Sequence, residues 1–487
     1  MNWRVAALAM WLLSQSLLPL RAEDSRPNIL LIVADDQSPQ DLQLYNPRSS
    51  LQTPVLATLA ERGTVLDNAC HMGSFSGAVC TPSRHMIMTG RTLWHLPNVR
   101  GMNRNCPADI VEWTLPAVFR RAGYATMRTC KRGNSYEAAN QQFEIRHDAT
   151  KRGATAADGS PWHAERVLDF LQQRRQTQDE RPFLIYLGFS HPHDERDGTP
   201  ELLARYGAVN HRSQEEAPPL HPDQPLLPVN YLPAHPFDMT HANVRDEVAV
   251  SGVWTRRDVP TVRNELGRQF ACSELIDQQI GRVLQRLQQS GELENTIVIY
   301  TADHGMSIGR HGLMGKQNLY QHTWQVPFIA AGPGIARGRR APGNVYLLDL
   351  LSTLCDLSGV PVPESSEGLS MRSVLNGTAE QTRDLLYGVY SGGSKPGIRC
   401  LRRGDWKLIT YQAPDRGVDE VQLFNLSSNP EEFLAEHQRP EVIAATGIQP
   451  LPDQTNLAGD PAYADRLEQM QALLQREMRR LGDPDAD

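Results

Sequence analysis

A short segment, Cys80-Thr81-Pro82-Ser83-Arg84, combines a nucleophile with the means of binding an anion. Pro82 suits the first position of a helix, and Gly90 suits the residue after its last turn. The first turn of such a helix points unpaired backbone N–H groups and the positive end of the helix dipole at an anion beside Cys80. Arg84, one turn further on, could bind the same anion through two hydrogen bonds. The alternative is a small buried cysteine at a helix cap.

A continuous apolar run, Ile29–Val33, is followed by two carboxylates, Asp35 and Asp36. Such a run is typical of a strand that is buried on both faces of a parallel sheet. Ligands gather at the carboxyl ends of these strands, and adjacent carboxylates repel each other unless a cation lies between them. The pair is therefore a candidate metal site, the alternative being two solvated loop aspartates.

Three more predicted strands end in polar side chains that can act as acids, bases or ligands. These strands and the residues that follow them are Tyr124–Thr129 with Lys131, Phe183–Leu187 with His191 and His193, and Thr296–Thr301 with Asp303 and His304. Because the carboxyl ends of parallel strands meet at one edge of a sheet, we expect all four strand ends to lie where the Cys80 helix begins. A surface histidine pair is the alternative for His191 and His193.

The Cys80 segment, together with Thr89-Gly90-Arg91, resembles the signature of the type I sulfatases, in which this cysteine is oxidised after translation to formylglycine. Further segments similar to that family follow in its order along the chain: RPNILLIVADD from Arg26, TADHG from Thr301 and HGLMGK from His311. The resemblance implies an α/β fold of the alkaline-phosphatase-like superfamily. It further implies a large, mostly parallel sheet flanked by helices, and a smaller C-terminal antiparallel-sheet subdomain.

The resemblance also assigns roles to named side chains. Formylglycine made from Cys80 would be the nucleophile, because its hydrated aldehyde offers one hydroxyl that attacks sulfur and a second that collapses to C=O and expels sulfate. The other catalytic residues that it implies are Arg84, Lys131, His193 and Lys316. The metal ligands that it implies are Asp35, Asp36, Asp303, His304 and the formylglycine oxygen at Cys80. This mostly oxygen set favours Ca²⁺ over Mg²⁺, and zinc fits it less well.

One position departs from the family pattern. The family carries a histidine shortly after the lysine that corresponds to Lys131, whereas Arg132, Gly133, Asn134 and Ser135 follow it here. Asn134 could occupy the space and form hydrogen bonds, but an amide cannot accept a proton at neutral pH. The group that deprotonates the hemiacetal is therefore left open. The residues that we expect to contact substrate are His191, His235, Asn134 and His311.

The first 22 residues have the pattern of a secretory signal. Arg4 supplies positive charge, Val5–Leu20 is mostly apolar, and Ala22 is a small residue at the cleavage point. The apolar run is short and interrupted, so an uncleaved anchor is the alternative. We expect an exported protein without stable membrane insertion, either periplasmic or secreted, or lysosomal or secretory in a eukaryote.

The composition bounds the partners and the redox chemistry. The chain of 487 residues has a net charge of −7 and no basic block, which argues against nucleic acid as a partner. Its seven cysteines are too few for a disulfide scaffold, and the sequence predicts no particular pairing.

The pattern divides the chain into a signal peptide (1–22), a catalytic domain (26–375) and a C-terminal subdomain with a terminal helix and tail (376–487). Helices are predicted over Thr261–Gln289 and Asn344–Leu357. A proline-rich excursion over 215–238 rises between elements of the sheet, and such loops often build substrate pockets. Candidate substrate contacts in and shortly after this region are His221, His235, Asp238 and Arg245, the alternative being that they are simply solvated loop residues.

These features predict hydrolysis of a sulfate ester, carried by a sulfated carbohydrate, after a formylglycine-generating maturation enzyme has converted Cys80. Two rival interpretations remain. One is a phosphate or phosphonate ester hydrolase of the same superfamily, and the other is a non-catalytic sulfoglycan-binding homologue.

Overall fold

The computed structural model describes residues 26–97, 106–150, 153–211, 213, 216–237, 257–393 and 395–486. The expected signal segment and the candidate contacts Asp238 and Arg245 lie outside these residues. Among the described residues, none of the helices combines the length and the apolar character that crossing a bilayer requires.

The main sheet has eight strands and is mostly parallel, as expected. Its order is β11 (Arg339–Ala341), β2 (Gly63–Leu66), β10 (Phe328–Ala331), β8 (Thr296–Ala302), β1 (Asn28–Asp35), β7 (Phe183–Pro192), β5 (Ala125–Lys131) and β6 (Ile145–Ala149). The five strands from β8 to β6 all run parallel, whereas β10 is antiparallel to both of its neighbours. The sheet is therefore an α/β sheet with one reversed strand near its edge.

The apolar run of β1 lies at the centre of this sheet. Ile29 pairs with Leu184 of β7 on one side and with Ile297 of β8 on the other, and all eight residues of β1 are buried. A strand that is covered on both faces has no solvent side, which explains why its residues are apolar without alternation. In-register parallel pairing then brings the carboxyl ends of β1, β7 and β8 to the same edge.

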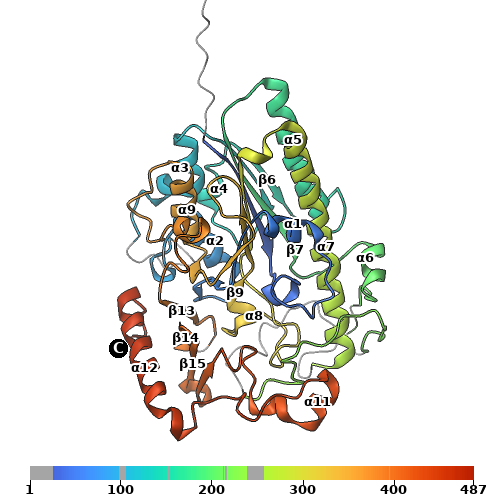
Figure 1. Ribbon diagram of the computed structural model, residues 1–487, viewed down its shortest axis with the longest axis vertical. Coiled ribbons are helices and arrows are strands. Elements are labelled where there is room, and N and C mark those ends of the chain that lie inside the picture. The colour runs from blue at the N-terminus through green and yellow to red at the C-terminus, as the bar shows by residue number, and fades with distance from the viewer. Residues whose placement is uncertain are drawn as a thin grey trace, which may run out of the picture.

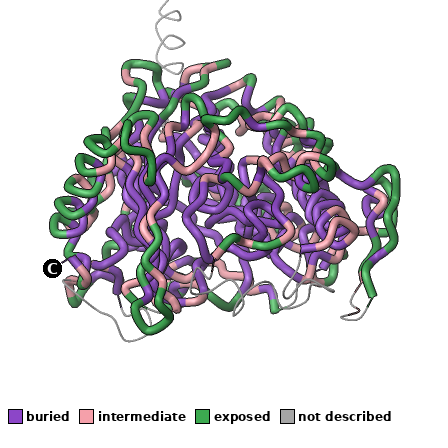
Figure 2. The backbone as a smooth tube through the Cα atoms, turned by 90° about the horizontal axis from the view of Figure 1, so that it is seen from below, coloured by how far each residue is buried: buried purple, intermediate pink, exposed green. Residues whose placement is uncertain are grey.

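Helices cover both faces of the main sheet (Figure 1). On one face α5 (Ser160–Thr177) packs against α7 (Val259–Ser290), and α1 (Pro54–Glu61) contacts α7 and β10. On the other face lie α2 (Cys80–Thr89), α3 (Leu115–Arg121) and α9 (Asp349–Leu357). The buried backbone accordingly runs through the middle of the molecule, and exposed backbone lies around it (Figure 2).

Short helices and a small sheet complete the catalytic half and the C-terminal part. The short helices are α4 (Glu137–Asn140), α6 (Pro200–Arg205), α8 (Gln321–Trp324), α10 (Arg372–Leu375) and α11 (Pro440–Thr446). The small sheet has the order β12 (Val345–Tyr346), β3 (Ala69–Cys70) and β9 (Gln325–Val326).

A separate five-stranded sheet forms the C-terminal part, in the lower half of Figure 1. Four strands form an antiparallel meander: β13 (Leu385–Tyr390), β14 (Gly397–Arg403), β15 (Trp406–Ala413) and β16 (Val418–Asn425). Helix α12 (Ala464–Leu481) packs on β14 and β15. The fifth strand, β4 (Gly73–Ser74), comes from the segment just before Cys80 and pairs with β13. The smaller sheet thus contacts the chain that leads to the candidate nucleophile.

Two expected helix boundaries are wrong. Helix α2 begins at Cys80, so that Pro82 is its third residue, although Gly90 does end it, with a left-handed φ of 66°. The helix expected to start at Asn344 starts at Asp349, because Val345 and Tyr346 pair with β3 instead. The Asp349 carboxylate accepts a hydrogen bond from the Tyr346 N–H at 2.8 Å, which ends the strand and opens the helix.

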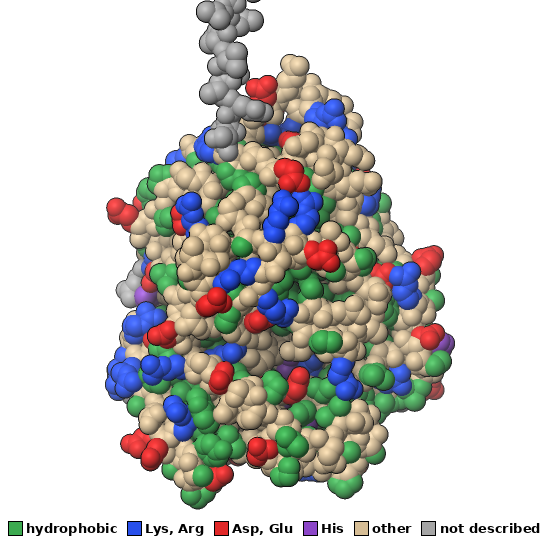
Figure 3. Space-filling model, in the orientation of Figure 1, with side chains coloured by type: hydrophobic (Ala, Val, Ile, Leu, Met, Phe, Trp, Pro, Cys, Tyr) green, Lys and Arg blue, Asp and Glu red, His purple; other side chains and the backbone are tan. Residues whose placement is uncertain are grey.

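The seven cysteines all lie among the described residues, and each is a free thiol. Acidic and basic side chains are interspersed over the face shown in Figure 3, in keeping with a chain of modest net charge.

Candidate active site

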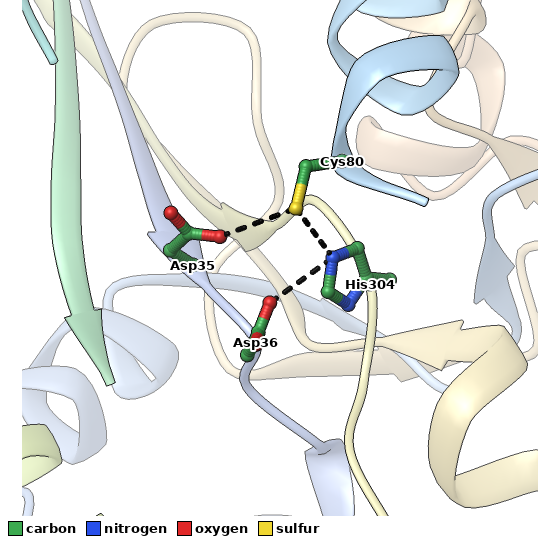
Figure 4. Close-up of side chains that lie close together, drawn as sticks. All are labelled: Asp35, Asp36, Cys80 and His304. Atoms are coloured by element: carbon green, nitrogen blue, oxygen red, sulfur yellow. Dashed lines mark hydrogen bonds and ion pairs between the residues drawn. The ribbon is translucent and has the colours of Figure 1, made fainter. Parts of the chain in front are cut away.

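The carboxyl edge of the main sheet gathers the polar side chains that follow its strands. Asp35 ends β1, Lys131 ends β5, and Asp303 directly follows β8. Cys80, as the first residue of α2, projects its sulfur toward the same edge (Figure 4). Six segments that are distant in sequence therefore contribute to one buried cluster, the other two being the chain around His193 after β7 and the segment that carries Lys316.

Four donor atoms lie close enough together to hold a metal ion. Asp35, Asp36, Cys80 and His304 each offer one atom, and these atoms all lie within 4.8 Å of one another. The sulfur of Cys80 is 3.2 Å from His304 Nε2 and 3.7 Å from Asp35 Oδ1 (Figure 4). His304 Nε2 is 3.1 Å from Asp36 Oδ1. All four residues are buried, so the cluster can bind a metal ion.

Asp303 lies beside this group. Its Oδ1 accepts a hydrogen bond from the Asp36 N–H at 3.2 Å and lies 3.6 Å from His304 Nε2. Its Oδ2 accepts a bond from Arg84 Nε at 3.0 Å. Asp36 has a left-handed φ of 70°, and strain of this kind persists at a site only where the surroundings hold it.

Three permanent cations neutralise the carboxylates. Lys131 Nζ is 2.5 Å from Asp35 Oδ2, and Lys316 Nζ is 2.8 Å from Asp36 Oδ2. Arg84 lies 3.6 Å from Asp35 in addition to its bond with Asp303. Buried charges persist only when they are paired and hydrogen-bonded. The same cations would face any anion that enters.

The site shifts the acidities of its members strongly. Burial would raise the pKa of Asp35, but Lys131 and Arg84 hold it well below its ordinary value. Burial and the nearby charge of Asp35 raise the pKa of Asp303 to about 6. The pKa of Cys80, which burial alone would raise, is brought well below its usual range by Lys131 and Lys316. The lowered pKa favours the thiolate form of this side chain.

The pKa values of the two histidines of the cluster are raised above the ordinary histidine value. Burial opposes protonation of His304, but the carboxylates of Asp303 and Asp36 raise its pKa to about 9. His193 behaves in the same way, because burial is outweighed chiefly by Asp36, and its pKa rises to about 10. His193 Nε2 lies 3.8 Å from Asp36 Oδ2. His193, Asp36 and Asp194 form a second possible ligand group that shares Asp36 with the first.

Four further sequence candidates lie elsewhere. Asn134 is exposed on the loop after β5, and His191 is buried with its Nδ1 3.3 Å from Ser160 Oγ. His235 Nδ1 donates to the backbone carbonyl of His311 at 2.9 Å. His311 stacks on Tyr320 with ring centroids 3.8 Å apart, and burial holds its pKa well below its ordinary value. The contribution of these four residues to substrate binding stays a prediction.

The structure adds neighbours of the site that the sequence did not reveal. Gln269, on α7, donates from Nε2 to the Asp36 carbonyl at 2.9 Å. Cys130 and Tyr186 accept bonds from Arg84 Nη1 at 2.8 and 3.2 Å. Asp194 contacts His193 Nδ1 through its carboxylate. Asp194 is adjacent to His193. The other residues lie in apolar strands or on a helix face that the sequence pattern assigns to the core, and they belong to no sequence motif.

Two cavities lie away from this cluster. One of about 470 Å³ is lined by Val55, Leu284 and Thr296, at the amino end of β8. Another, of about 760 Å³, is lined by Trp113 and Val362. The members of the cluster are buried, and His193 is the most exposed of them at 8%.

Comparison with known proteins places these residues in a family context. The family model described as Sulfatase matches residues 27–360, and the model described as N-sulphoglucosamine sulphohydrolase, C-terminal, matches residues 309–447. Among curated proteins, arylsulfatase K of Rattus norvegicus is 25% identical over 437 residues, covering 84% of this chain and 74% of that protein. Choline-sulfatase of Rhizobium meliloti is 27% identical over 472 residues, covering 86% and 85%.

Solved structures share the fold. BT4656, solved with its substrate D-glucosamine-2-N,6-O-disulfate, is 20% identical and has a TM-score of 0.67, covering 95% of this chain and 99% of its own. Phosphonate monoester hydrolase of Agrobacterium radiobacter is 17% identical with a TM-score of 0.68, covering 94% and 96%. At these identities the likeness extends to the fold and does not distinguish sulfate from phosphonate chemistry.

Proposed function

The chain belongs to the sulfatase family and is a sulfuric ester hydrolase. On that premise we propose that it cleaves a sulfate ester of a carbohydrate, and that it does so with formylglycine made from Cys80 and a bound divalent cation. The observation that carries the proposal is the burial of Cys80 among carboxylates, His304 and three cations at one sheet edge. This arrangement supplies a nucleophile, a cation site and neutralising charge within one cluster.

The donor set fits a hard divalent cation. Asp35, Asp36, Asp303 and His304 would hold the ion, and its chemical contribution would be positive charge beside the nucleophile, which would favour ionisation of a hydroxyl there. Carboxylate oxygens dominate the set, which favours Ca²⁺, with Mg²⁺ the second choice. Gln269 supports the site by fixing the backbone of Asp36.

The position of Cys80 fits formylglycine. A hydrated aldehyde there supplies both a hydroxyl nucleophile and a second hydroxyl that releases sulfate, which a thiol cannot do. The residue is 1% exposed in the folded chain. We propose that a formylglycine-generating enzyme acts on this chain, and that the chain is exported after loss of residues 1–22.

The cations of the site would bind the sulfuryl oxygens and stabilise the charge that develops on them. Lys316 lies 3.8 Å from the Cys80 sulfur, within reach of a group that reacts there. Lys131 and Arg84 flank the opposite carboxylate, Asp35. Because all three side chains are held by ion pairs, little reorganisation is needed when the anion enters.

His193 is placed to protonate the departing oxygen. Its Nδ1 donates to the backbone carbonyl of Asp194 at 2.8 Å, because a carbonyl oxygen can only accept. The other ring nitrogen, Nε2, is thus the atom that faces the cluster and can hold or transfer a proton. His193 is also the most exposed member of the cluster, so its ring is the one most accessible to a leaving group.

A sulfated carbohydrate is the substrate class that we propose. The support is the family match, whose second model is described by an N-sulphoglucosamine sulphohydrolase, together with a structural neighbour whose own substrate is a sulfated glucosamine. A phosphonate hydrolase shares the fold only at 17% identity, whereas the sulfatase family model matches the chain directly. A sulfate ester is therefore preferred over a phosphonate ester as the proposed substrate.

The test is a substrate panel on enzyme whose position 80 has been examined by mass spectrometry. The panel contains sulfated mono- and oligosaccharides, choline sulfate, 4-nitrophenyl sulfate, and the matching phosphate and phosphonate esters. We expect turnover of a sulfated sugar by converted enzyme and none by Cys80→Ala, with Cys106→Ser, a partly exposed cysteine, as the control for thiol loss. Faster cleavage of the phosphonate, or sugar binding without turnover by converted enzyme, would replace the proposal by one of its rivals.

A further inference from the structure

The segment between His304 and Lys316 folds back on itself, so that both ends lie at the candidate active site. Backbone N–H groups donate across this loop, here called the 307–315 loop, at 2.7 to 3.3 Å. The pairs are Ser307 with Gly315, Ile308 with Met314, and Gly309 with Leu313. The position of Lys316 therefore depends on how this loop and the residues after it are anchored.

The tip of the loop is anchored on the C-terminal part of the chain. His311 Nε2 donates to the backbone carbonyl of Glu432 at 2.9 Å, and the His311 N–H donates to the Asn230 carbonyl at 2.7 Å. His311 and Glu432 have left-handed φ angles of 53° and 54°. Non-glycine residues rarely adopt left-handed φ angles, and here two such residues contact each other. The surrounding structure therefore imposes the backbone geometry of this junction.

A buried ion pair anchors the residues that follow Lys316. Lys407 Nζ lies 2.5 Å from Glu432 Oε1, and the two side chains are 0% and 1% exposed. Lys407 Nζ also donates to the Leu319 carbonyl at 2.7 Å. The second carboxylate oxygen of Glu432 accepts from the Gln321 N–H at 2.7 Å. The pair therefore forms hydrogen bonds with the backbone of Leu319 and Gln321, three and five residues after Lys316.

A buried ion pair adds little net stability, because desolvation offsets the attraction between the charges. Its hydrogen bonds to a neighbouring backbone are a separate effect, since they fix where that backbone lies. Leu319 is at most about 11 Å of extended chain from Lys316, so a shift at Leu319 is passed to the lysine. A displacement of only about 1 Å at a catalytic group can lower a rate on the order of 10²-fold.

We propose that Lys407 and Glu432 are positioning residues, which fix the loop and segment that carry Lys316 and so make the C-terminal sheet part of the catalytic machinery. The inference rests on the role proposed above for Lys316. It also gives His311 a part in docking the loop on Glu432.

The test compares wild type with Lys407→Met and Glu432→Gln, using enzyme matched for formylglycine content. We expect kcat on a sulfate ester to fall on the order of 10- to 10²-fold, with a change in KM of less than about threefold, because the lysine acts on the transition state. Hydrogen exchange of the peptide Gln317–Trp324 should become faster in both variants, whether or not a substrate is known.

A second buried ion pair of the C-terminal part, between a strand of the sheet and the segment after α12, is the matched control. Arg399 and Asp483 lie 2.7 Å apart with side chains 3% and 0% exposed, and their other partners include Tyr387 and Asp485. Arg399→Met and Asp483→Asn should reduce thermal stability comparably but leave kcat and exchange of Gln317–Trp324 unchanged. Lys407→Arg, which can keep both bonds, should recover most of the rate.

The double variant Lys407→Met/Glu432→Leu separates positioning from stability. It leaves no unpaired buried charge, so part of the stability lost in Lys407→Met should return, while kcat stays low because Leu319 and Gln321 still lack their partners. Recovery of kcat together with stability would overturn the positioning role, as would unchanged exchange in Lys407→Met and Glu432→Gln.

If instead wild type cleaves no sulfate ester, the proposed function fails, and the exchange measurement alone decides whether the pair holds the segment. If Lys407→Met does not fold, Glu432→Gln, which keeps the volume, supports or overturns the inference by the same criteria.

Discussion

The ammonium nitrogen of Lys316 lies 2.8 and 2.9 Å from the two carboxylate oxygens of Asp36. The same nitrogen is 3.8 Å from the sulfur of Cys80. Lys316 therefore lies between a candidate metal ligand and the candidate nucleophile, where its charge can act on either. Most of the predictions below concern the members of this cluster.

Removing the Lys316 charge should slow catalysis. We expect Lys316→Ala to lower kcat on the order of 10²- to 10³-fold, the usual effect of losing one electrostatic donor at a developing charge. Lys395, which is exposed, provides the control Lys395→Ala. Steady-state kinetics on enzyme of equal formylglycine content is the measurement, and a normal kcat in Lys316→Ala would remove this lysine from the mechanism.

Calcium should stabilise the folded protein, because three carboxylates converge at a buried site. A ligand that binds only the folded state adds about 2.7 kcal/mol at 100 times its Kd. We expect the Tm to rise with Ca²⁺, to fall with a chelator, and to respond much less in Asp36→Asn. Asp223→Asn, at an exposed carboxylate, is the control. A Tm that ignores both calcium and chelator would contradict a structural cation at these ligands.

His193 should matter more for poor leaving groups than for good ones. A sugar alkoxide needs a proton as it departs, whereas 4-nitrophenolate does not. We expect His193→Gln to lower kcat on a sugar sulfate by about 10²-fold or more, and on 4-nitrophenyl sulfate by much less. His211→Gln, at a half-buried histidine outside the cluster whose Nε2 contacts the Glu216 carbonyl, should change neither rate. Equal losses on the two substrates would assign His193 to binding instead of proton transfer.

Stability should fall in mild acid because several histidines are buried in their neutral form. Burial lowers the pKa of His85 to about 4, although its bond to the Thr81 carbonyl opposes this. The unfolded chain, with an ordinary histidine pKa near 6.5, then takes up the proton first, so stability is present above about pH 6.5 and is lost as the pH falls toward 4. At pH 5 this residue alone accounts for about 2 kcal/mol.

The check on His85 is urea unfolding at pH 7 and pH 5. His85→Gln can keep the hydrogen bond to Thr81 without titrating, so the loss between the two pH values should be smaller by about 2 kcal/mol than in wild type. An identical pH dependence in wild type and His85→Gln would show that His85 does not titrate differently on folding.

The sheet and the position of its polar edge could be predicted because the information is local. A continuous apolar run such as Ile29–Val33 must be covered on both faces, and parallel packing then aligns the residues that follow each run. Asp35, Asp303 and His304 come directly after such strands, so their meeting at one edge follows from strand direction alone. The α/β fold and the C-terminal antiparallel sheet are confirmed by the structure.

The positions of loop residues could not be predicted from strand direction. Asn134, His235 and His311 lie in loops outside the Cys80 cluster: Asn134 is exposed, His235 contacts the His311 carbonyl, and His311 is buried against Glu432. The start of α9 was placed five residues too early, because a two-residue pairing with β3 is too short to leave a periodic pattern.

The amino-acid sequence by itself determined the family, the core strands and the chemical types available at their ends, since each depends on residues that are close together in the chain. Only the tertiary structure decided that Gln269 holds Asp36, that β4 joins the C-terminal sheet, and that Lys407 and Glu432 grip the segment after Lys316. These contacts join residues that are tens to hundreds of positions apart, and their partners are common polar residues without a motif. Their pairing depends on how two sheets dock, which no local pattern encodes.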